Sequence, residues 1–274
     1  MKSNYLLLLL LPCILSFEGD VDYADQTTWE GICTTGQSQS PINIPKKSDC
    51  KEVDDIATID TVSYNAISGK KIEFAHEYTY RIDATDSDSS ITVFINGTEF
   101  KYNLDNIHFH LNSEHTIDGT SYNMEMHLVH TLDESSKKND PDDKNAYMVI
   151  AVIYNKDDDA DDDDFIEKCN FDTQTAVSGL SLDQFVSDKK SFYYYHGGLT
   201  TPHCDESVNW IVMDTINKMS KDQFEQFASY IKTEYPNGNN RAVQALNGRT
   251  VYYVSNCNYV SLSIFATLIL LFVF

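Results

Sequence analysis

The chain has 274 residues and a formal net charge of −22, because 42 Asp and Glu residues outnumber 20 Lys and Arg residues. So acidic a surface repels polyanions, which makes nucleic acids and heparin-like chains poor partners, whereas small neutral substrates are unaffected. About 240 residues lie between the two hydrophobic ends, enough for one sizeable domain with a large core.

The first sixteen residues predict a secretory signal peptide. Lys2 precedes the apolar run Leu6–Leu11, and the small residue Ser16 stands before polar sequence. An apolar block of this length is too short to span a bilayer and is typical of a cleaved leader. We therefore expect residues 1–16 to be removed and the mature domain to span residues 18–254.

The other end predicts the signal for a lipid anchor. Tyr259–Phe274 is apolar, and no Lys or Arg follows it. Its length of about 16 residues falls short of the roughly 20 that a spanning helix needs. Ser255 and Asn256 are the candidate attachment residues for a glycosylphosphatidylinositol anchor, with residues 257–274 removed. We expect a cell-surface protein on the outer leaflet, with a tail-anchored or a freely secreted protein as the alternatives.

Short β-rich runs recur along the chain and predict a mainly β single domain. They have the length and the alternation of half-buried strands. One clear amphipathic helix begins after Ser220, its expected N-cap, and places Phe224, Phe227 and Ile231 on one face. The expected strands cover residues 58–64, 71–82, 91–95, 99–104, 106–111, 122–130 and 147–154.

The cysteines indicate an oxidising compartment. Cys13 and Cys257 lie in the two end segments, and the four that remain allow two disulfides in three possible pairings. Asn96 begins the N-glycosylation sequon Asn-Gly-Thr, which has the sequence of a hairpin tip. The four remaining cysteines are Cys33, Cys50, Cys169 and Cys204.

An acidic run, Asp157–Asp164, is the densest charge block in the chain. A run of like charges is usually a solvated loop. Calcium binding is the minor alternative, because the run lacks the regular ligand spacing of a built site.

A cluster of histidines is the candidate chemical site. His108 and His110 stand two apart in the alternating run N-I-H-F-H-L, so in a strand both imidazoles project from one face. After the turn signal Asp118-Gly119, a second alternating run could pair antiparallel and bring His127 opposite them. Three imidazoles with a fourth position open are the ligand set of a catalytic zinc site. A lone His is more often a surface residue or a core residue whose hydrogen bonds are satisfied, so the cluster alone does not establish a metal site.

The stretch Tyr195–Trp210 offers a partner for the fourth position. Two glycines before L-T-T-P let the backbone turn tightly and hold a hydroxyl at a fixed distance from a strand. If Thr200 gives its hydrogen to a carboxylate, its oxygen can only accept a hydrogen bond from a group at the metal, and Glu114 is the candidate carboxylate. In isolation the segment is more typical of a Thr-Pro turn in a secreted protein.

Five blocks of sequence resemble the α-class carbonic anhydrases. They occur in the order of that family and near its spacings, over essentially the whole mature chain from about Tyr23 to Tyr253. The resemblance implies a central, mostly antiparallel, twisted ten-stranded sheet with a few short peripheral helices and a zinc ion at the bottom of a conical cleft. The blocks are Q-S-P-I-N-I (39–44), H-F-H (108–110), S-E-H-T (113–116), E-M-H-L-V-H (125–130) and L-T-T-P (199–202).

The resemblance also assigns a role to each matching residue. The zinc ligands by position are His108, His110 and His127, and Thr200 with Glu114 forms the relay that orients the reacting oxygen.

Three further residues match supporting roles in the family. Glu125 matches the acceptor that orients His127, and Asn106 stands where the family usually has a Gln beside His108, one methylene longer. His76, in F-A-H-E-Y, matches the proton-shuttle histidine of the cleft rim, a role that suits a pKa near neutrality.

An apolar pocket for carbon dioxide is implied beside the metal. Val129 shares a strand face with His127, while Leu128 and His130 face away. The residues matching the pocket are Val129, Val149, Leu199, Thr201 and Trp210.

Cys33 and Cys204 match a disulfide common in secreted members of the family, which would tie the L-T-T-P loop to the N-terminal segment. By elimination Cys50 would then pair with Cys169. Two departures from the family's pattern, Leu111 after H-F-H and His203 after T-T-P, are expected to line or flank the cleft.

The expected function is zinc-dependent, reversible hydration of carbon dioxide to bicarbonate by a monomer tethered at the cell surface. The alternative is a non-catalytic, anhydrase-like surface protein kept for binding or adhesion. Such a protein would be expected to lose zinc ligands or the Thr200–Glu114 pair, and this chain keeps them all.

Overall fold

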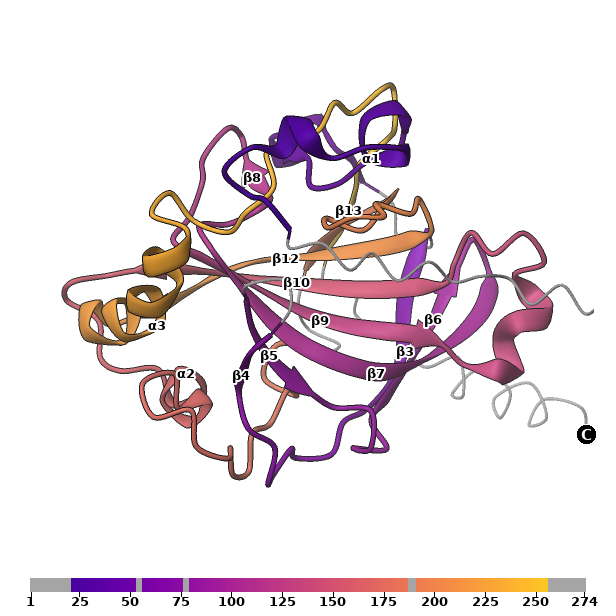
Figure 1. Ribbon diagram of the computed structural model, residues 1–274. Coiled ribbons are helices and arrows are strands. Elements are labelled where there is room, and N and C mark those ends of the chain that lie inside the picture. Colours follow the sequence, from indigo (N-terminus) through magenta and orange to yellow (C-terminus); the bar gives the residue numbers. More distant parts are fainter. Residues whose placement is uncertain (1–20, 53–55, 76–78, 187–190, 256–274) are drawn as a thin grey trace, which may run out of the picture.

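A twisted sheet of eleven strands runs through the protein (Figure 1), seen in a computed structural model that describes residues 21–52, 56–75, 79–186 and 191–255. Most neighbouring strands are antiparallel, and the pairs β10–β12 and β13–β2 are parallel. The expected mainly β single domain is confirmed. We expected ten strands, and the described residues form eleven in this sheet, of which β2 has only two residues.

The strand order is β2-β13-β11-β12-β10-β9-β7-β5-β4, with β6 paired to β7 and β3 paired to β6. A separate parallel pair is formed by β1 (Asn43–Ile44) and β8 (Thr116–Ile117). The strands of the large sheet are β2 (Lys51–Glu52), β3 (Ala57–Ser63), β4 (Glu73–Ala75), β5 (Thr79–Asp83), β6 (Ser90–Ile95), β7 (Thr98–Leu111), β9 (Met124–Leu132), β10 (Tyr147–Lys156), β11 (Phe192–Gly197), β12 (Val208–Met219) and β13 (Tyr252–Val254).

The central strands bury both of their faces, and alternate residues belong to two different clusters. The main core includes Ile107, Phe109 and Leu111 of β7 and Met124, Met126 and Leu128 of β9. The opposite face carries the histidines and a second cluster, here called the site-side core. The site-side core consists of Ile42, Ile44, Val129, Val149, Ala151, Ile153, Tyr193, Tyr195, Val208, Trp210, Val212, Val251 and Tyr253.

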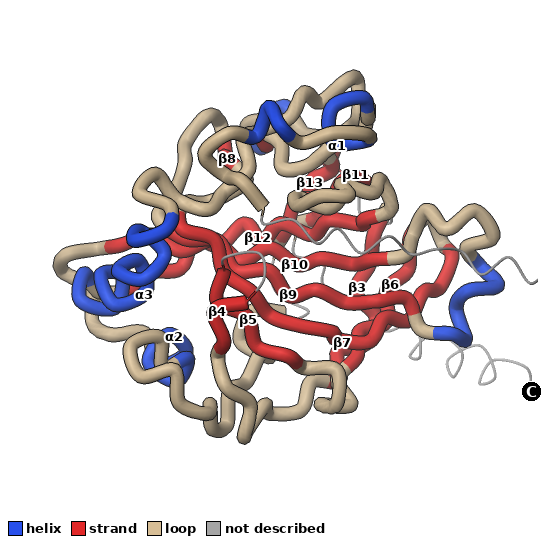
Figure 2. The backbone as a smooth tube through the Cα atoms, viewed as in Figure 1, coloured by secondary structure: helices blue, strands red, loops and turns tan. Residues whose placement is uncertain are grey.

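Helices cover the main-core face near one end of the sheet (Figure 2). They are α2 (Asp164–Cys169) and α3 (Lys221–Glu234), and a shorter helix, α1 (Ile32–Thr35), lies in the N-terminal segment. The predicted N-cap of α3 is confirmed, because the Ser220 hydroxyl accepts from Gln223 N in a capping box. Short 3₁₀ helices span Gln26–Thr28, Lys47–Asp49 and Glu134–Asn139. No helix in the described ranges is long and apolar enough to cross a membrane.

The cysteines confirm one predicted bridge and correct the other. Cys33 and Cys204 form a disulfide. Cys50 and Cys169 are both free, so the pairing expected by elimination is wrong. The two thiols lie on opposite faces of the sheet: Cys50 packs against the site-side core, whereas Cys169, in α2, belongs to the main core.

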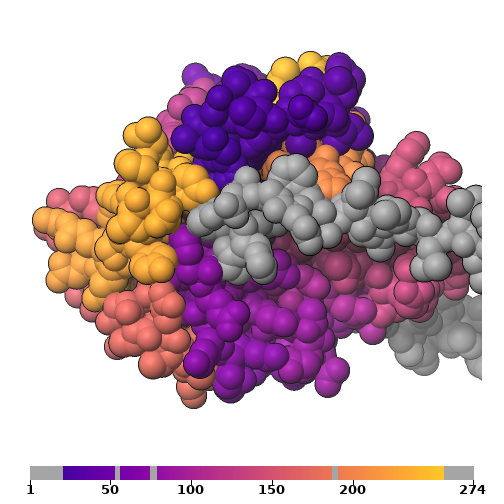
Figure 3. All heavy atoms as spheres, viewed as in Figure 1, coloured from indigo at the N-terminus to yellow at the C-terminus, as the bar shows by residue number. Residues whose placement is uncertain are grey.

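The N-terminal segment and the segment that follows α3 lie side by side (Figure 3). Hydrogen bonds join them: Gln26 Nε2 donates to Asn240 O at 2.9 Å, and Arg241 Nη2 donates to Cys33 O at 2.9 Å. Segments from the two ends of the domain therefore close over the sheet face that carries the histidines.

Candidate metal centre

Three histidines converge on one point. His108 and His110 project from β7, and His127 projects from β9, where it is paired in register with His108. One ring nitrogen of each lies within 4.8 Å of the others. The antiparallel neighbour predicted from the sequence thus brings His127 opposite the first pair.

The second nitrogen of each ring is held by an oxygen. His108 Nδ1 lies 2.9 Å from Asn106 Oδ1, and His127 Nε2 lies 2.7 Å from Glu125 Oε1. His110 Nδ1 lies 2.9 Å from the carbonyl oxygen of Asn239. Because these oxygens accept, the bonded nitrogens carry the hydrogens, which leaves lone pairs on His108 Nε2, His110 Nε2 and His127 Nδ1.

These three lone pairs fit a zinc ion. His110 Nε2 is buried and has no hydrogen-bond partner among the described residues, which is the condition of a ligand atom that faces its metal. Burial, together with the neighbouring histidines, lowers the pKa of His108. Burial also lowers the pKa of His127, against the raising effect of Glu125. His108 and His127 can therefore act as neutral ligands, and the set of three nitrogens suits catalytic zinc.

Glu125 accepts three hydrogen bonds beside the site. It is fully buried and accepts from His127 Nε2 and His115 Nδ1, each at 2.7 Å, and from His115 N at 2.8 Å. Burial alone would raise the pKa of Glu125, but His115 and His127 bring it well below its usual range. His115 is held in turn by Tyr195, whose hydroxyl lies 2.6 Å from His115 Nε2. The ring of His127 is thus fixed through an ionised carboxylate.

Glu114 lies behind the histidines. Its Oε1 accepts from Arg241 N at 2.8 Å, and its Oε2 lies 4.0 Å from His127 Nε2. Oε2 is buried and has no hydrogen-bond partner among the described residues. Thr200 is 5% exposed and makes no hydrogen bond to Glu114 in the described structure, so the relay between them stays a prediction.

The residues predicted for the apolar pocket gather beside His127. Val149 is paired across β10 with Val129 on one side and Trp210 on the other, so these three form one row on the site-side face. The Trp210 ring lies 5.0 Å from the His127 ring, centre to centre. Leu199 packs against the same cluster.

The segment that carries Thr200 is fixed on both sides. Before it, a Cβ on Gly198 would lie 3.0 Å from Cys204 O, so the close approach of the two backbone strands favours glycine. After it, the disulfide ties Cys204 to Cys33. Thr201, next in the chain, is partly exposed.

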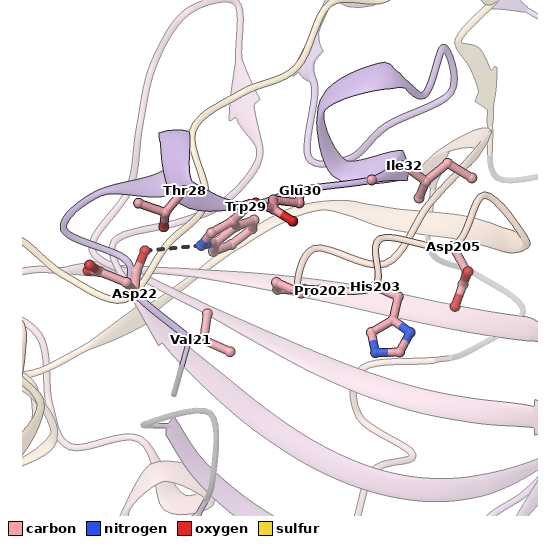
Figure 4. A pocket seen from close by; sticks show the side chains of 10 residues that line it. Val21, Asp22, Thr28, Trp29, Glu30, Ile32, Pro202, His203 and Asp205 are labelled. Carbon is pink, nitrogen blue, oxygen red and sulfur yellow. Dashed lines mark hydrogen bonds between the residues drawn. The ribbon is translucent and has the colours of Figure 1, made fainter. Parts of the chain in front are cut away.

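A cavity of about 500 Å³ lies beside this segment (Figure 4). Pro202 and His203 form one wall, and Val21, Trp29 and Ile32 of the N-terminal segment lie across from them. Three acidic residues also line it, and none of the three converging histidines does. The acidic residues are Asp22, Glu30 and Asp205.

The two departures from the family's pattern lie in different places. His203 is exposed and lines the cavity described above, and its position at the rim of the catalytic cleft stays a prediction. The expectation that Leu111 lines or flanks the cleft is wrong. Leu111 is 2% exposed and belongs to the main core, because it alternates with His110 along β7.

Comparison with known proteins gives the family. The family model for eukaryotic-type carbonic anhydrase matches residues 24–255. The chain belongs to this family. A carbonic anhydrase of Dunaliella salina is 30% identical over 252 residues, an alignment that covers 81% of this chain and 41% of that protein. The chain thus spans less than half the length of that relative.

Other carbonic anhydrases align with this chain along most of their own length. Carbonic anhydrase Nec1 of Nesocodon mauritianus is 32% identical over 234 residues, covering 81% of this chain and 76% of that protein. The solved α-carbonic anhydrase of Thermovibrio ammonificans, in complex with the inhibitor sulfanilamide, has a TM-score of 0.62 and 28% identity. That match covers 81% of this chain and 89% of the solved chain.

Three supporting residues of this carbonic anhydrase site were not found from the sequence. Asn239 bonds His110 through its main chain, and a carbonyl oxygen leaves no signal in the residue type. Arg241 approaches Glu114 from a loop 127 residues away, also through its backbone. His115 lies inside the block S-E-H-T, and the residue pattern of that block does not indicate that its side chain bonds Glu125.

Some predicted residues lie outside the described ranges. His76, the expected proton shuttle, is one of them, as are residues 1–16, Asn256 and residues 257–274. Asn96 lies at the exposed tip of the β6–β7 hairpin, as predicted, with its φ at 49°.

Proposed function

We propose that this protein catalyses the reversible hydration of carbon dioxide to bicarbonate and a proton, with a zinc ion held by His108, His110 and His127. The observation that carries the proposal is the donor set: three imidazoles, two of them buried and His108 partly exposed, each with its second nitrogen bonded to an oxygen and its remaining lone pair aimed at one point. When bound, zinc supplies Lewis-acid chemistry that lets a coordinated water ionise near neutral pH, a property for which carbonic anhydrases are themselves the standard example.

The protein's own groups prepare the reaction in three ways. One ring N–H of each histidine donates to an oxygen, so that the other ring nitrogen faces the metal. The acceptors are Asn106, Glu125 and the Asn239 carbonyl. Glu114 Oε2 is free to take the Thr200 hydrogen, which would leave the Thr200 oxygen able only to accept. A nucleophile that donates to Thr200 keeps its lone pair directed at the substrate.

The apolar row beside His127 is the proposed carbon dioxide pocket. Val129 and Val149 are 8% and 2% exposed, and Trp210 is 1% exposed, so a small apolar molecule would replace little ordered water there. Leu199 and Thr201 are the proposed residues at the entrance of this pocket. His76 is the proposed carrier of the released proton to solvent.

The experiment is a stopped-flow hydration assay on purified protein whose zinc content is measured in parallel. We expect one zinc per chain, loss of hydration after removal of zinc by a chelator, and recovery when zinc is added back. Hydration that persists in protein verified to be free of metal would refute the proposal.

We also propose a cell-surface setting, with the mature domain glycosylated at Asn96 and joined to a lipid anchor at Ser255 or Asn256. The disulfide Cys33–Cys204 and the exposed sequon support an oxidising compartment. Release of the protein from intact cells by a phospholipase specific for phosphatidylinositol would support the anchor. Retention after complete enzyme treatment would refute it.

A further inference from the structure

We propose that Arg241 is a positioning residue for this reaction, holding Glu114 and the Leu199–Thr200 segment in the arrangement that makes Thr200 an acceptor. The inference rests on the proposed function. It assigns to one buried arginine the task of joining two parts of the site that come from distant parts of the chain.

Arg241 contacts both parts directly. Its backbone N–H donates to Glu114 Oε1 at 2.8 Å. Its guanidinium Nη1 donates to Ser40 O at 2.7 Å and, through a longer contact of 3.5 Å, to Leu199 O. Leu199 immediately precedes Thr200, so one side chain reaches the segment that carries the hydroxyl.

The arginine is itself firmly held. It is 3% exposed, and Nη2 donates to Cys33 O at 2.9 Å, next to the disulfide that secures the other end of the Thr200 segment. The guanidinium carbon lies 5.3 Å from the centre of the Trp29 ring, within the range of a cation–π contact. Burial lowers the pKa of Arg241 and Glu114 raises it, so the two groups also interact electrostatically.

The bond to Arg241 N leaves the two oxygens of Glu114 unequal. Oε1 is occupied, and Oε2 is the buried oxygen without a partner among the described residues. Oε2 is then the oxygen with both lone pairs open to the Thr200 hydrogen. The geometry needed is that Thr200 faces Oε2, and Arg241 sets it by fixing the carboxylate on one side and the Leu199 carbonyl on the other.

This role predicts a selective effect on ligands at the metal. A ligand that brings an N–H, such as an aromatic sulfonamide, gains a hydrogen bond to a Thr200 oxygen that can only accept. Thiocyanate has no hydrogen to donate and gains nothing from it. The ratio of the two affinities therefore reports the orientation of Thr200, whereas a general loss of stability would leave the ratio unchanged.

The matched control is Arg249. It is partly buried and, like Arg241, donates to main-chain oxygens, with Nη2 2.7 Å from Gln39 O and 2.9 Å from Ala245 O. None of its hydrogen bonds reaches Glu114 or the Leu199–Thr200 segment. Replacing either arginine removes a similar set of side-chain bonds, but only the Arg241 side chain bonds the Leu199 carbonyl next to Thr200 and anchors the backbone N–H that donates to Glu114. That backbone bond is itself present in every variant, so the comparison measures how well the side chain positions it.

The experiment compares wild type, Arg241→Gln, Arg241→Lys and Arg249→Gln as zinc-loaded proteins. Calorimetry gives the affinities for benzenesulfonamide and thiocyanate, and thermal unfolding gives stability. We expect Arg241→Gln to lower the ratio of sulfonamide to thiocyanate affinity by roughly tenfold, about the net contribution of one hydrogen bond. Arg241→Lys keeps the charge without the planar fork, so we expect an intermediate ratio. Arg249→Gln should lower the melting temperature and leave the ratio at the wild-type value.

Two results would overturn the inference: a wild-type ratio in folded Arg241→Gln, or equal changes in the Arg241 and Arg249 variants. If Arg241→Gln does not fold, the Arg241→Lys ratio decides, and a wild-type value there is the contradicting result. Absence of zinc or of hydration in the wild type would instead defeat the proposed function, so the two failures are distinguishable.

Discussion

Replacing Glu125 by Gln tests how strongly the protein depends on an acceptor-only group behind His127. Glu125 accepts three hydrogens: two N–H groups of His115 and the Nε2–H of His127. A glutamine side chain has one acceptor oxygen and one NH₂ group. The glutamine amide can be placed in two ways, and in each its NH₂ group faces at least one buried N–H that it cannot accept from. In one of the two placements that N–H is the Nε2–H of His127.

The magnitude follows from these bonds. Hydrogen bonds to an ionised acceptor contribute about 1.5–3 kcal/mol each, and a buried donor left without a partner costs about 1–3 kcal/mol. Loss of a group that orients a metal-bound histidine typically weakens metal binding by about 10- to 100-fold. We therefore expect Glu125→Gln to raise the zinc dissociation constant within that range and to lower the melting temperature.

The assay is zinc competition against a chromophoric chelator at neutral pH. Tyr195→Phe is the control, because it removes the hydroxyl that contacts His115 Nε2 and leaves both bonds of Glu125 to His115 and its bond to His127 in place. We expect zinc affinity near the wild-type value in the control. An unchanged zinc affinity in folded Glu125→Gln would refute the reasoning.

Three other predictions concern stability and the pocket. Replacing Cys33 and Cys204 together by Ser should lower the free energy of unfolding by roughly 5 kcal/mol, the chain-entropy value for a bridge spanning 171 residues, and denaturant titration would measure it; a loss under about 1 kcal/mol would contradict this. Burial brings the pKa of His130 to about 4 from 6.5, so the unfolded chain binds more protons between these values. The contribution of neutral His130 to the free energy of unfolding should be complete above pH 6.5 and fall by roughly 3 kcal/mol as the pH is lowered to 4. Denaturant unfolding of His130→Gln across this range would refute this if its midpoint depended on pH as steeply as that of the wild type. Val129→Tyr should fill the proposed pocket and reduce kcat/KM for carbon dioxide at unchanged zinc content, and wild-type kinetics in the variant would show that carbon dioxide binds elsewhere.

Much of the fold could be predicted from alternation alone. The runs around His108 and His127 alternate because one face meets the main core and the other meets the site, and the observed register pairs these two residues. The runs predicted at 99–104 and 106–111 proved to be one strand, β7, because its irregularity between Leu104 and Asn106 interrupts the alternation without ending the strand. The strand β12 was not predicted. Its first half is buried on both faces and, apart from Asn209, apolar, so it lacks the alternation by which half-buried strands are recognised.

The site was predictable where side chains carry the chemistry and not where the backbone does. The three histidines and Glu125 have the residue types and the order that a metal site requires, so the sequence indicates them. The support of His110 by the Asn239 carbonyl and of Glu114 by the Arg241 N–H could not be predicted, since any residue but proline offers these groups. The prediction of a disulfide between Cys50 and Cys169 was wrong for a related reason, because a count of cysteines carries no information about which face of the sheet each one occupies.

The most direct test of the account is the zinc content and the carbon dioxide hydration rate of His127→Ala, measured on the same preparation as the wild type. His127 supplies one of the three nitrogens that converge within 4.8 Å. We predict a folded protein that neither retains zinc after dialysis nor hydrates carbon dioxide above the uncatalysed rate. Wild-type hydration by this variant, with no zinc bound, would contradict the central claim.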